Sequence, residues 1–131
     1  DINVKRTNFL AKIKDDNKFF LVGSNGKLSS IKHEDKSNYL PFIFGQPEID
    51  TFLEFKIKID DSKFKYKDIN NLFFFSSGRW DIQLKNDLLI KLPSKNIKKT
   101  LDLVSDFLLE NNNNSIKIVD ARIQNQIILD D

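Results

Sequence analysis

The sequence predicts an α+β domain in which a mainly antiparallel β-sheet is combined with two principal helices. Ile, Leu and Phe dominate the apolar residues, with 12 Phe and only 4 Gly, and β-branched and aromatic side chains suit a pleated, half-buried sheet. Short apolar runs are separated by turn residues, and two segments repeat apolar residues at helical spacing. A chain of 131 residues can form one hydrophobic core. We therefore expect a single core and no parallel βαβ crossover.

The N-terminal part predicts three strands, at about residues 8–14, 18–23 and 27–32. Asn25 and Gly26 stand between apolar runs, and Asn-Gly is a strong hairpin signal because both residues tolerate a positive φ. The second and third strands should therefore form a hairpin.

The next segment predicts a connector followed by a helix. Residues 42–45 are apolar but bracketed by Pro41 and Pro47, so we expect an irregular connector with buried anchors. Residues 48–57 place apolar side chains on one helical face and predict the first helix. From Phe55 onward apolar residues alternate with lysines, which leaves the end of that helix open.

The second half predicts a hairpin, the second helix and a terminal strand. Apolar residues alternate on both sides of the turn residues 86–87. Residues 95–110 show helical spacing, and Ser94 is placed to cap this helix. The segment 116–129 has strand composition, but its apolar residues change parity, so we expect a bulge or kink near Val119.

Composition argues against several classes of protein. The formal net charge is +2 with both signs interspersed, which gives no large field for steering phosphate or anionic lipid. The chain has no cysteine, so it has neither a disulfide framework nor a thiolate ligand. No apolar run approaches the roughly 20 residues that span a bilayer, and the first residues lack the order of a signal peptide.

The sequence carries no motif that supports catalysis. The single histidine, His33, has no second His or Cys nearby, so a metal site would lack ligands and a solvated loop histidine is expected. The acidic pairs 15–16, 60–61 and 130–131 fall at predicted turns and at the terminus, which favours solvated carboxylates over a glycosidase pair. Residues 76–78 lack a nucleophile elbow, and no glycine-rich phosphate loop occurs. We expect no enzymatic activity, no metal and no cofactor.

Two short motifs allow both a structural and an interface role. Trp80 beside Arg79 could be an exposed interface pair, but a lone tryptophan in an alternating strand is more typical of core packing. Asp120 and Arg122 lie two residues apart, so their side chains share one face of a strand. A structural ion pair and a polar contact to a partner both remain open for this second pair.

A third motif alternates basic and aromatic residues. Lys63, Lys65 and Lys67 flank Phe64 and Tyr66, which is similar to the groove of single-strand nucleic-acid binders. An amphipathic strand with its lysines facing water explains the pattern as well and needs no ligand.

Three strings follow one another in an order that resembles the FtsQ/DivIB family of bacterial cell-division proteins. They are GRWDIQL at 78–84, LLIKLP at 88–93 and, after a helix, VDARI at 119–123. With weaker similarity upstream, the resemblance covers about residues 8–129. The family-motif positions, to which the resemblance gives a structural role, are Arg79, Trp80, Asp81, Leu84, Lys91, Leu92, Pro93 and Asp120.

The resemblance implies a curved sheet with the helices packed on it and a non-enzymatic scaffold role at the division septum. Residues 1–7 would be the tail of a preceding POTRA-like domain, and 8–131 the FtsQ-type β domain. A single transmembrane helix further upstream would anchor the protein in the inner membrane, with this domain in the periplasm.

The resemblance also implies the partners, which are proteins of the FtsB and FtsL type, and the place where they bind. In the family a segment of FtsB adds to the last strand, the mode known as β-augmentation. The expected partner-binding residues are Arg122, Ile123, Gln124, Asn125, Gln126, Ile127, Ile128 and Leu129. The alternatives are a nucleic-acid-binding β domain using the Lys63–Lys67 ladder and an enzyme with a carboxylate site. Steep salt dependence would identify the nucleic-acid binder.

Overall fold

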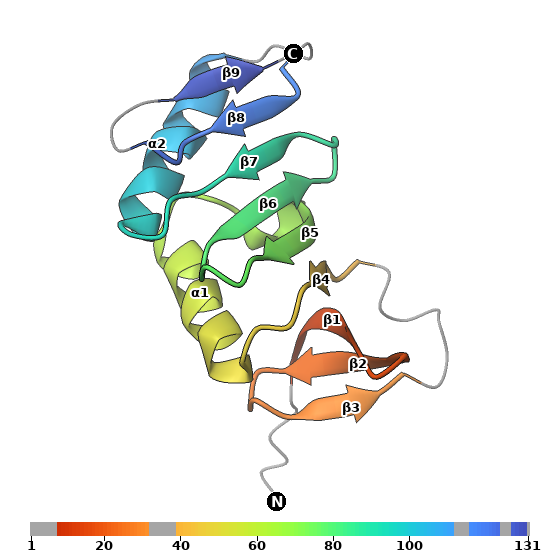
Figure 1. Cartoon of the computed structure of the whole chain (residues 1–131). Helices are drawn as coiled ribbons and strands as arrows, with labels where there is room; N and C mark the ends of the chain where they lie inside the picture. The colour runs from red at the N-terminus through yellow and green to blue at the C-terminus, as the bar shows by residue number, and fades with distance from the viewer. Residues whose placement is uncertain (1–7, 32–38, 112–115, 124–126, 131) are drawn as a thin grey trace, which may run out of the picture.

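The computed structural model describes residues 8–31, 39–111, 116–123 and 127–130, and they form one sheet and two principal helices (Figure 1). The helices are α1 (Ile49–Asp61) and α2 (Ile97–Glu110), and a short 3-10 helix is η2 (Tyr66–Asp68). The strands are β1 (Phe9–Asp15), β2 (Lys18–Gly23), β3 (Leu28–Ser30), β4 (Phe42–Phe44), β5 (Ile69–Phe74), β6 (Trp80–Leu84), β7 (Leu89–Lys91), β8 (Ile118–Asp120) and β9 (Ile128–Asp130).

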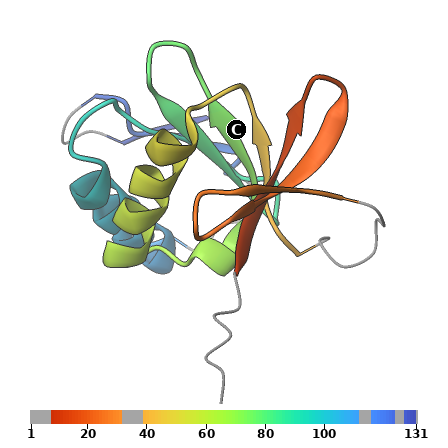
Figure 2. The ribbon, with the colours of Figure 1, turned by 90° about the horizontal axis from the view of Figure 1, so that it is seen from below.

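The sheet has nine strands in the order β3-β2-β1-β4-β5-β6-β7-β8-β9. Five of its eight pairings are antiparallel, and the pairings β1–β4, β4–β5 and β7–β8 are parallel. The α+β fold with a mainly antiparallel sheet is therefore confirmed. The expectation of no parallel crossover is wrong, because α1 and α2 each carry the chain back along the sheet and the next strand then runs parallel to the previous one. Both helices cover the same face (Figures 1 and 2).

Tight turns fix the three N-terminal strands. Asp16 and Asn17 both have positive φ, at 51° and 64°, as a two-residue turn between right-twisted strands requires. The expected hairpin at Asn25 and Gly26 is confirmed, and Gly26 supplies the positive φ of 80° there. Antiparallel pairing of β1 with β2 and of β2 with β3 follows from these turns.

The expected irregular connector is instead a strand. β4 pairs with β1 on one side and with β5 on the other, and the Lys12 amide donates to the Pro41 carbonyl oxygen at 2.9 Å. Proline at position 41 can precede a strand because its own missing N–H is not needed in the ladder. The three residues of β4 thus join the N-terminal strands to the rest of the sheet.

Both helices are where the helical spacing predicts them, with shifted ends. α1 continues to Asp61, beyond the expected 57, because Ile59 is also buried on its inner face. α2 begins at Ile97 with Asn96 as its N-cap. The cap expected at Ser94 is wrong, because the chain first makes a left-handed turn at Asn96, where φ is 59°.

The segment from Lys63 to Lys67 is not the expected strand. Phe64 is buried, and Tyr66 lies in η2 with its hydroxyl donating to the Leu10 carbonyl oxygen at 2.6 Å. Lys56 places its ammonium 4.5 Å from the centre of the Tyr66 ring. The two aromatic rings face the fold, so they do not form a stacking platform for bases.

The core is centred on Trp80, whose side chain is only 3% exposed. Its ring stacks on Phe55 of α1 with 4.5 Å between centroids and 3° between planes. Phe74 of the adjacent strand contacts it at 4.9 Å, and Phe52 lies 6.3 Å away. The packing interpretation of Trp80 is therefore confirmed.

Trp80→Ala should lower the free energy of unfolding by about 3–5 kcal/mol, because it leaves a cavity between α1 and the sheet. Urea denaturation followed by circular dichroism measures the loss. Leu109→Ala is the control, because Leu109 is 80% exposed on α2 and its removal should change stability by less than about 0.5 kcal/mol. Equal losses in the two variants would contradict the assignment of Trp80 to the centre of the core.

Candidate protein-binding edge

β9 forms one edge of the sheet, because in the described part of the chain only β8 pairs with it. The register places Asp120 opposite Ile128 and Val119 opposite Leu129. The expected bulge near Val119 is absent from this ladder, because the pairing runs through Val119 without a shift. An edge strand presents unpaired backbone N–H and C=O groups, so this edge can accept a further strand.

The hydrogen bonds of β8 fix which amides of β9 face outward. The Lys117 carbonyl accepts from Leu89, and the Ala121 amide donates to Lys91, both at 2.9 Å. Backbone groups of consecutive residues point to opposite sides of a strand, so Asp120, which is next to Ala121, points to β9. Its partner Ile128 must then point back toward β8. Leu129, one residue further on, directs its N–H and C=O away from the sheet.

Three large apolar side chains surround this edge. Ile123, Ile128 and Leu129 are each between 45% and 53% exposed. Ile128 and Leu129 lie on opposite faces of β9, since side chains alternate along a strand. A strand added to β9 would therefore gain apolar contacts on both faces as well as backbone hydrogen bonds.

Arg79 links β6 to the end of β7. Its Nη1 donates to the Asp81 carboxylate at 3.0 Å and to the Leu92 carbonyl oxygen at 2.8 Å. Its guanidinium also lies 5.0 Å from the centre of the Phe75 ring. Burial raises the pKa of Asp81 above its usual 3.8, although the charge and hydrogen bond of Arg79 act in the opposite direction. The stability due to Asp81 is therefore fully present below pH 3.8 and lost as the pH rises through its raised pKa.

Asp120 and Arg122 form the ion pair that one interpretation of the sequence expected. Arg122 donates from Nη2 at 2.6 Å, from Nε at 2.9 Å and from its backbone amide at 3.1 Å to the Asp120 carboxylate. The side-chain hydrogen bond is the main reason that the pKa of Asp120 lies below 3.8. Stability from this pair is present above pH 3.8 and lost as the pH falls through the lowered pKa. Arg122 itself is exposed, so the pair also faces solvent beside the edge.

A basic pocket of about 280 Å³ lies beside the end of β8. It has three cationic side chains and several hydroxyl or amide groups in its wall. Its lining residues are Arg79, Pro93, Ser94, Lys95, Asn96, Thr100 and Arg122. No carboxylate lines it, but Arg79 and Arg122 are each paired with an aspartate, so among the described residues it is Lys95 that gives the pocket its excess positive charge next to the free edge.

The structure places the remaining expected site residues as follows. Gln124, Asn125 and Gln126 lie outside the described residues, as do His33 and residues 1–7. Lys91 lies on β7, and Leu92 is buried directly after it.

Sequence reasoning missed the pocket, because Lys95 and Thr100 come from a helix start whose position depends on the turn at Asn96. In the described segments there is no group of three or more potential metal ligands, and no helix is long and apolar enough to cross a membrane.

Comparison with known proteins supplies a family for this arrangement. A family model for cell-division proteins matches residues 11–122, and no curated protein is similar enough in sequence to count as a match. Among solved structures, the major extracytoplasmic domain of the trans isomer of the cell-division protein DivIB from Geobacillus stearothermophilus has a similar fold. The TM-score is 0.55 at 12% identity, over 83% of this chain and 97% of that chain.

The chain thus belongs to a family of bacterial cell-division proteins. The matching region is the C-terminal domain of FtsQ/DivIB, and the match covers most of the chain. The resemblance inferred from the three sequence strings is confirmed, and two of those strings carry the Arg79–Asp81 and Asp120–Arg122 pairs.

Arg79→Met should lower the free energy of unfolding at pH 7 by about 2–3 kcal/mol. The Asp81 carboxylate would stay buried without a cation, and the loss is smaller than the 3–5 kcal/mol of a fully buried pair because Arg79 is partly exposed. The loss should shrink at pH 3, because burial raises the pKa of Asp81 above its usual 3.8 and protonation removes the charge that Arg79 pairs. Urea titrations at both pH values measure it. Arg79→Met combined with Asp81→Asn should recover most of the loss, and a failure to recover would show that the cation–carboxylate pair is not its cause.

Proposed function

We propose that this domain is a non-enzymatic scaffold of the division machinery and that it binds a partner protein by strand addition to β9. The observation that carries the proposal is the outward-facing backbone of Leu129 at the edge of the sheet, flanked by the half-exposed side chains of Ile123 and Ile128. Membership of the FtsQ/DivIB family supports a role in cell division. FtsB-type and FtsL-type proteins are the partners that we propose.

Strand addition accounts for an edge that is otherwise a liability. An exposed apolar edge invites aggregation unless it is short, charged or covered. β9 is short, but two of its three residues are large and apolar. A partner segment would pair with the backbone of Leu129 and cover the apolar side chains on both faces, in the manner of other β-augmentation complexes.

The basic pocket suggests what the partner segment carries. Lys95 and Arg122 face a space beside the end of β8 that no carboxylate lines. An acidic side chain of the partner would find guanidinium and ammonium donors there, and charge-assisted hydrogen bonds are about twice as strong as neutral ones. Such a contact would fix the register of the added strand.

The family and the similar solved domain, whose description is extracytoplasmic, support a proposed location. We propose that this domain lies in the periplasm at the septum. Residues 1–7 would continue a POTRA-like domain, and a single transmembrane helix further upstream would anchor the protein in the inner membrane. The complete coding sequence of the gene would test both points.

Nucleic-acid binding has less support. Phe64 is buried and Tyr66 is held by its hydrogen bond to Leu10, so no aromatic platform faces solvent in this segment. Lys63 bonds Asp106 through its ammonium at 3.1 Å. Phosphate contacts would make the affinity fall steeply with salt, whereas strand addition depends mainly on backbone hydrogen bonds and apolar contact.

Leu129→Pro should weaken binding of an FtsB-type peptide about tenfold and leave the domain folded. The substitution removes one outward-facing N–H and disturbs its neighbour, and each such hydrogen bond contributes roughly 0.5–1.5 kcal/mol. Isothermal titration calorimetry measures the affinity, and thermal unfolding checks the fold.

Two proline variants control this experiment. Ile128→Pro removes an N–H that faces β8, so it should lower stability as well as affinity. Ser30→Pro removes an N–H that points away from the sheet at the opposite edge, which β3 forms. The backbone groups of Lys27 and Ile31 bond β2, so those of Ser30, next to Ile31, point outward. Ser30→Pro should leave binding unchanged. Parent-like binding by folded Leu129→Pro would place the partner elsewhere.

Lys95→Glu tests the basic pocket by itself. Reversing one charge at the rim should slow association of an acidic peptide several-fold and reduce the salt dependence of its rate, because rim charges act mainly on the rate of encounter. Stopped-flow fluorescence at two salt concentrations measures this. Lys65→Glu, on the segment before η2, should have no effect, and equal slowing by both variants would indicate a general charge effect.

A further inference from the structure

The face of the sheet that the helices leave open carries a row of aromatic rings far from the proposed partner edge. The row crosses β2, β4 and β5, and four strands separate β4 from β9. Phe42 and Phe44 lie on this face of β4, because Ile43 between them is buried on the other face. The centroids of Phe42 and Phe44 are 4.7 Å apart, Phe44 stacks on Phe73 at 5.0 Å, and Phe19 meets Phe42 at 6.1 Å. The four rings therefore hold one another in place.

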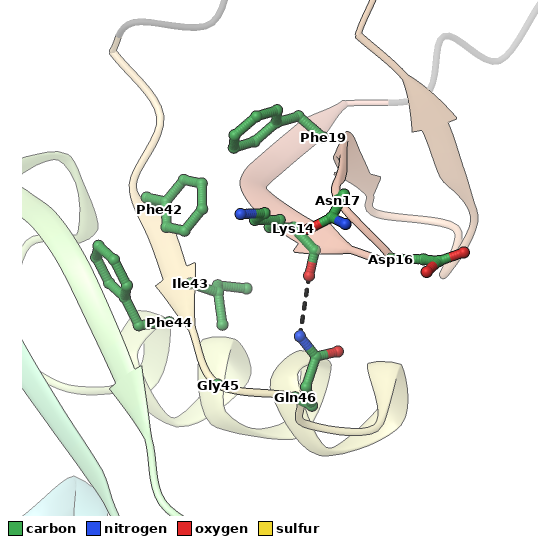
Figure 3. A pocket seen from close by; sticks show the side chains of 9 residues that line it. All are labelled: Lys14, Asp16, Asn17, Phe19, Phe42, Ile43, Phe44, Gly45 and Gln46. Carbon is green, nitrogen blue, oxygen red and sulfur yellow. Dashed lines mark hydrogen bonds between the residues drawn. The ribbon is translucent and has the colours of Figure 1, made fainter.

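Two of these rings are half exposed and flank an open recess. Phe19 is 50% exposed and Phe44 45% exposed. The recess lies between the β1–β2 hairpin and β4 and has a volume of about 620 Å³, and Phe19, Phe42 and Phe44 line it together with Lys14 (Figure 3). Contiguous exposed apolar patches mark contact sites for proteins, ligands or membranes. We call the four rings, with Lys12 and Lys14 of β1, the aromatic face.

The aromatic face carries positive charge without a carboxylate. Lys12 and Lys14 alternate with the buried Ile13, so both ammonium groups lie on the same side as the rings. Asp15 is the only acidic residue in the strands β1 to β5, and it lies on the opposite side because it follows Lys14. Asp16, in the turn, points away from the rings (Figure 3). Within the described residues neither lysine forms an ion pair, so this face favours a negatively charged occupant.

The backbone of the aromatic face offers nothing to an extended peptide. β1, β4 and β5 each have a paired strand on both sides, so their N–H and C=O groups are directed to neighbouring strands. A peptide that lay across the rings would bury its own backbone groups without partners, which is costly. Acyl chains have no such groups. The tip of the β1–β2 hairpin also stands apart from both helices (Figures 1 and 2), so a flat surface can approach it without meeting them.

We propose that the aromatic face binds the surface of an anionic lipid bilayer. The headgroup phosphates pair with the ammonium groups of Lys12 and Lys14, each of which raises the affinity about fivefold. The rings of Phe19 and Phe44 enter the boundary between headgroups and acyl chains, where apolar and basic side chains act together in interfacial proteins. The chain as a whole has a net charge of only +2, so the attraction comes from this face and not from long-range steering.

Co-sedimentation of the full chain with vesicles of phosphatidylglycerol and of phosphatidylcholine tests the proposal. Binding to phosphatidylglycerol should be about tenfold stronger, and it should weaken when the salt is raised from about 20 to about 200 mM, because salt screens exposed charges. Lys14→Glu should lower the affinity by about tenfold or more, since it removes one attraction and adds a repulsion. Lys99→Glu is the matched control, because Lys99 is exposed on α2 and its reversal changes the net charge equally. It should change the affinity less than about twofold.

Phe44→Trp reports whether the rings enter the bilayer. The new indole should shift its fluorescence to the blue with phosphatidylglycerol vesicles, and brominated lipids should quench it, whereas the buried Trp80 gives a constant background. Phe44→Ala should weaken vesicle binding about five- to tenfold, as expected for the loss of a half-exposed ring. Leu109→Ala removes an exposed apolar side chain from α2, on the other side of the sheet, and should leave vesicle binding unchanged. Thermal unfolding checks that each variant is folded.

The other outcomes overturn the proposal. Absence of binding to millimolar phosphatidylglycerol at low salt would exclude a lipid surface. Equal losses in Lys14→Glu and Lys99→Glu, or binding without a blue shift in Phe44→Trp, would show adsorption through overall charge. A helical peptide satisfies its own backbone, so binding of an acidic amphipathic helix without vesicle binding, lost in Phe44→Ala, would assign the face to a protein partner. Peptide binding at β9 is measured separately, so failure here leaves the proposed scaffold role untouched.

Discussion

The stacking of Trp80 on Phe55 joins the two layers of this fold. Trp80 begins β6, in the middle of the sheet, and Phe55 lies at the centre of α1. Because the rings are nearly parallel and fully enclosed, α1 can take only one position along the sheet. That position sets where β5 begins and so fixes the register of β6 and β7. Arg79 and Asp81 are the residues on either side of Trp80, so the geometry of their ion pair depends on the same contact.

Local patterns predicted most of the elements but not all of their connections. Apolar alternation and turn residues identified the hairpins, and helical spacing located both helices. β4 was missed because three residues between two prolines carry no periodicity, and its strand character comes from β1 and β5 on either side. The parallel crossovers were missed for a similar reason, since the direction of a strand depends on what the preceding helix packs against. The strand expected at Lys63–Lys67 failed because Phe64 and Tyr66 both turn toward the core.

The candidate edge was predictable only in part. Strand composition at the chain end and the family resemblance both indicated β9, whereas the two-residue spacing of Asp120 and Arg122 left an ion pair and a contact to a partner equally open. Which amide of β9 faces outward could not be read from composition, because it depends on the hydrogen bonds between β7 and β8. The basic pocket likewise combines Arg79 just before β6, residues at the start of α2 and Arg122 just after β8. Such a site exists only after the helix has placed the end of β8 beside β7.

The shortness of β4 has a mechanical consequence. In the part of the chain that the structure describes, only β4 connects the three N-terminal strands to the remainder of the sheet, and its pairing with β1 extends over two residue pairs. Gly45 follows it with a φ of 101°, and a side chain there would collide with the Phe74 carbonyl oxygen, so the join cannot easily be reinforced at that end. When two paired strands are pulled along their length, all the hydrogen bonds between them bear the load together. When the strands are peeled apart, the hydrogen bonds break one at a time. Tension that peels β1 from β4 would therefore separate the N-terminal strands first and leave the half that carries β9 folded.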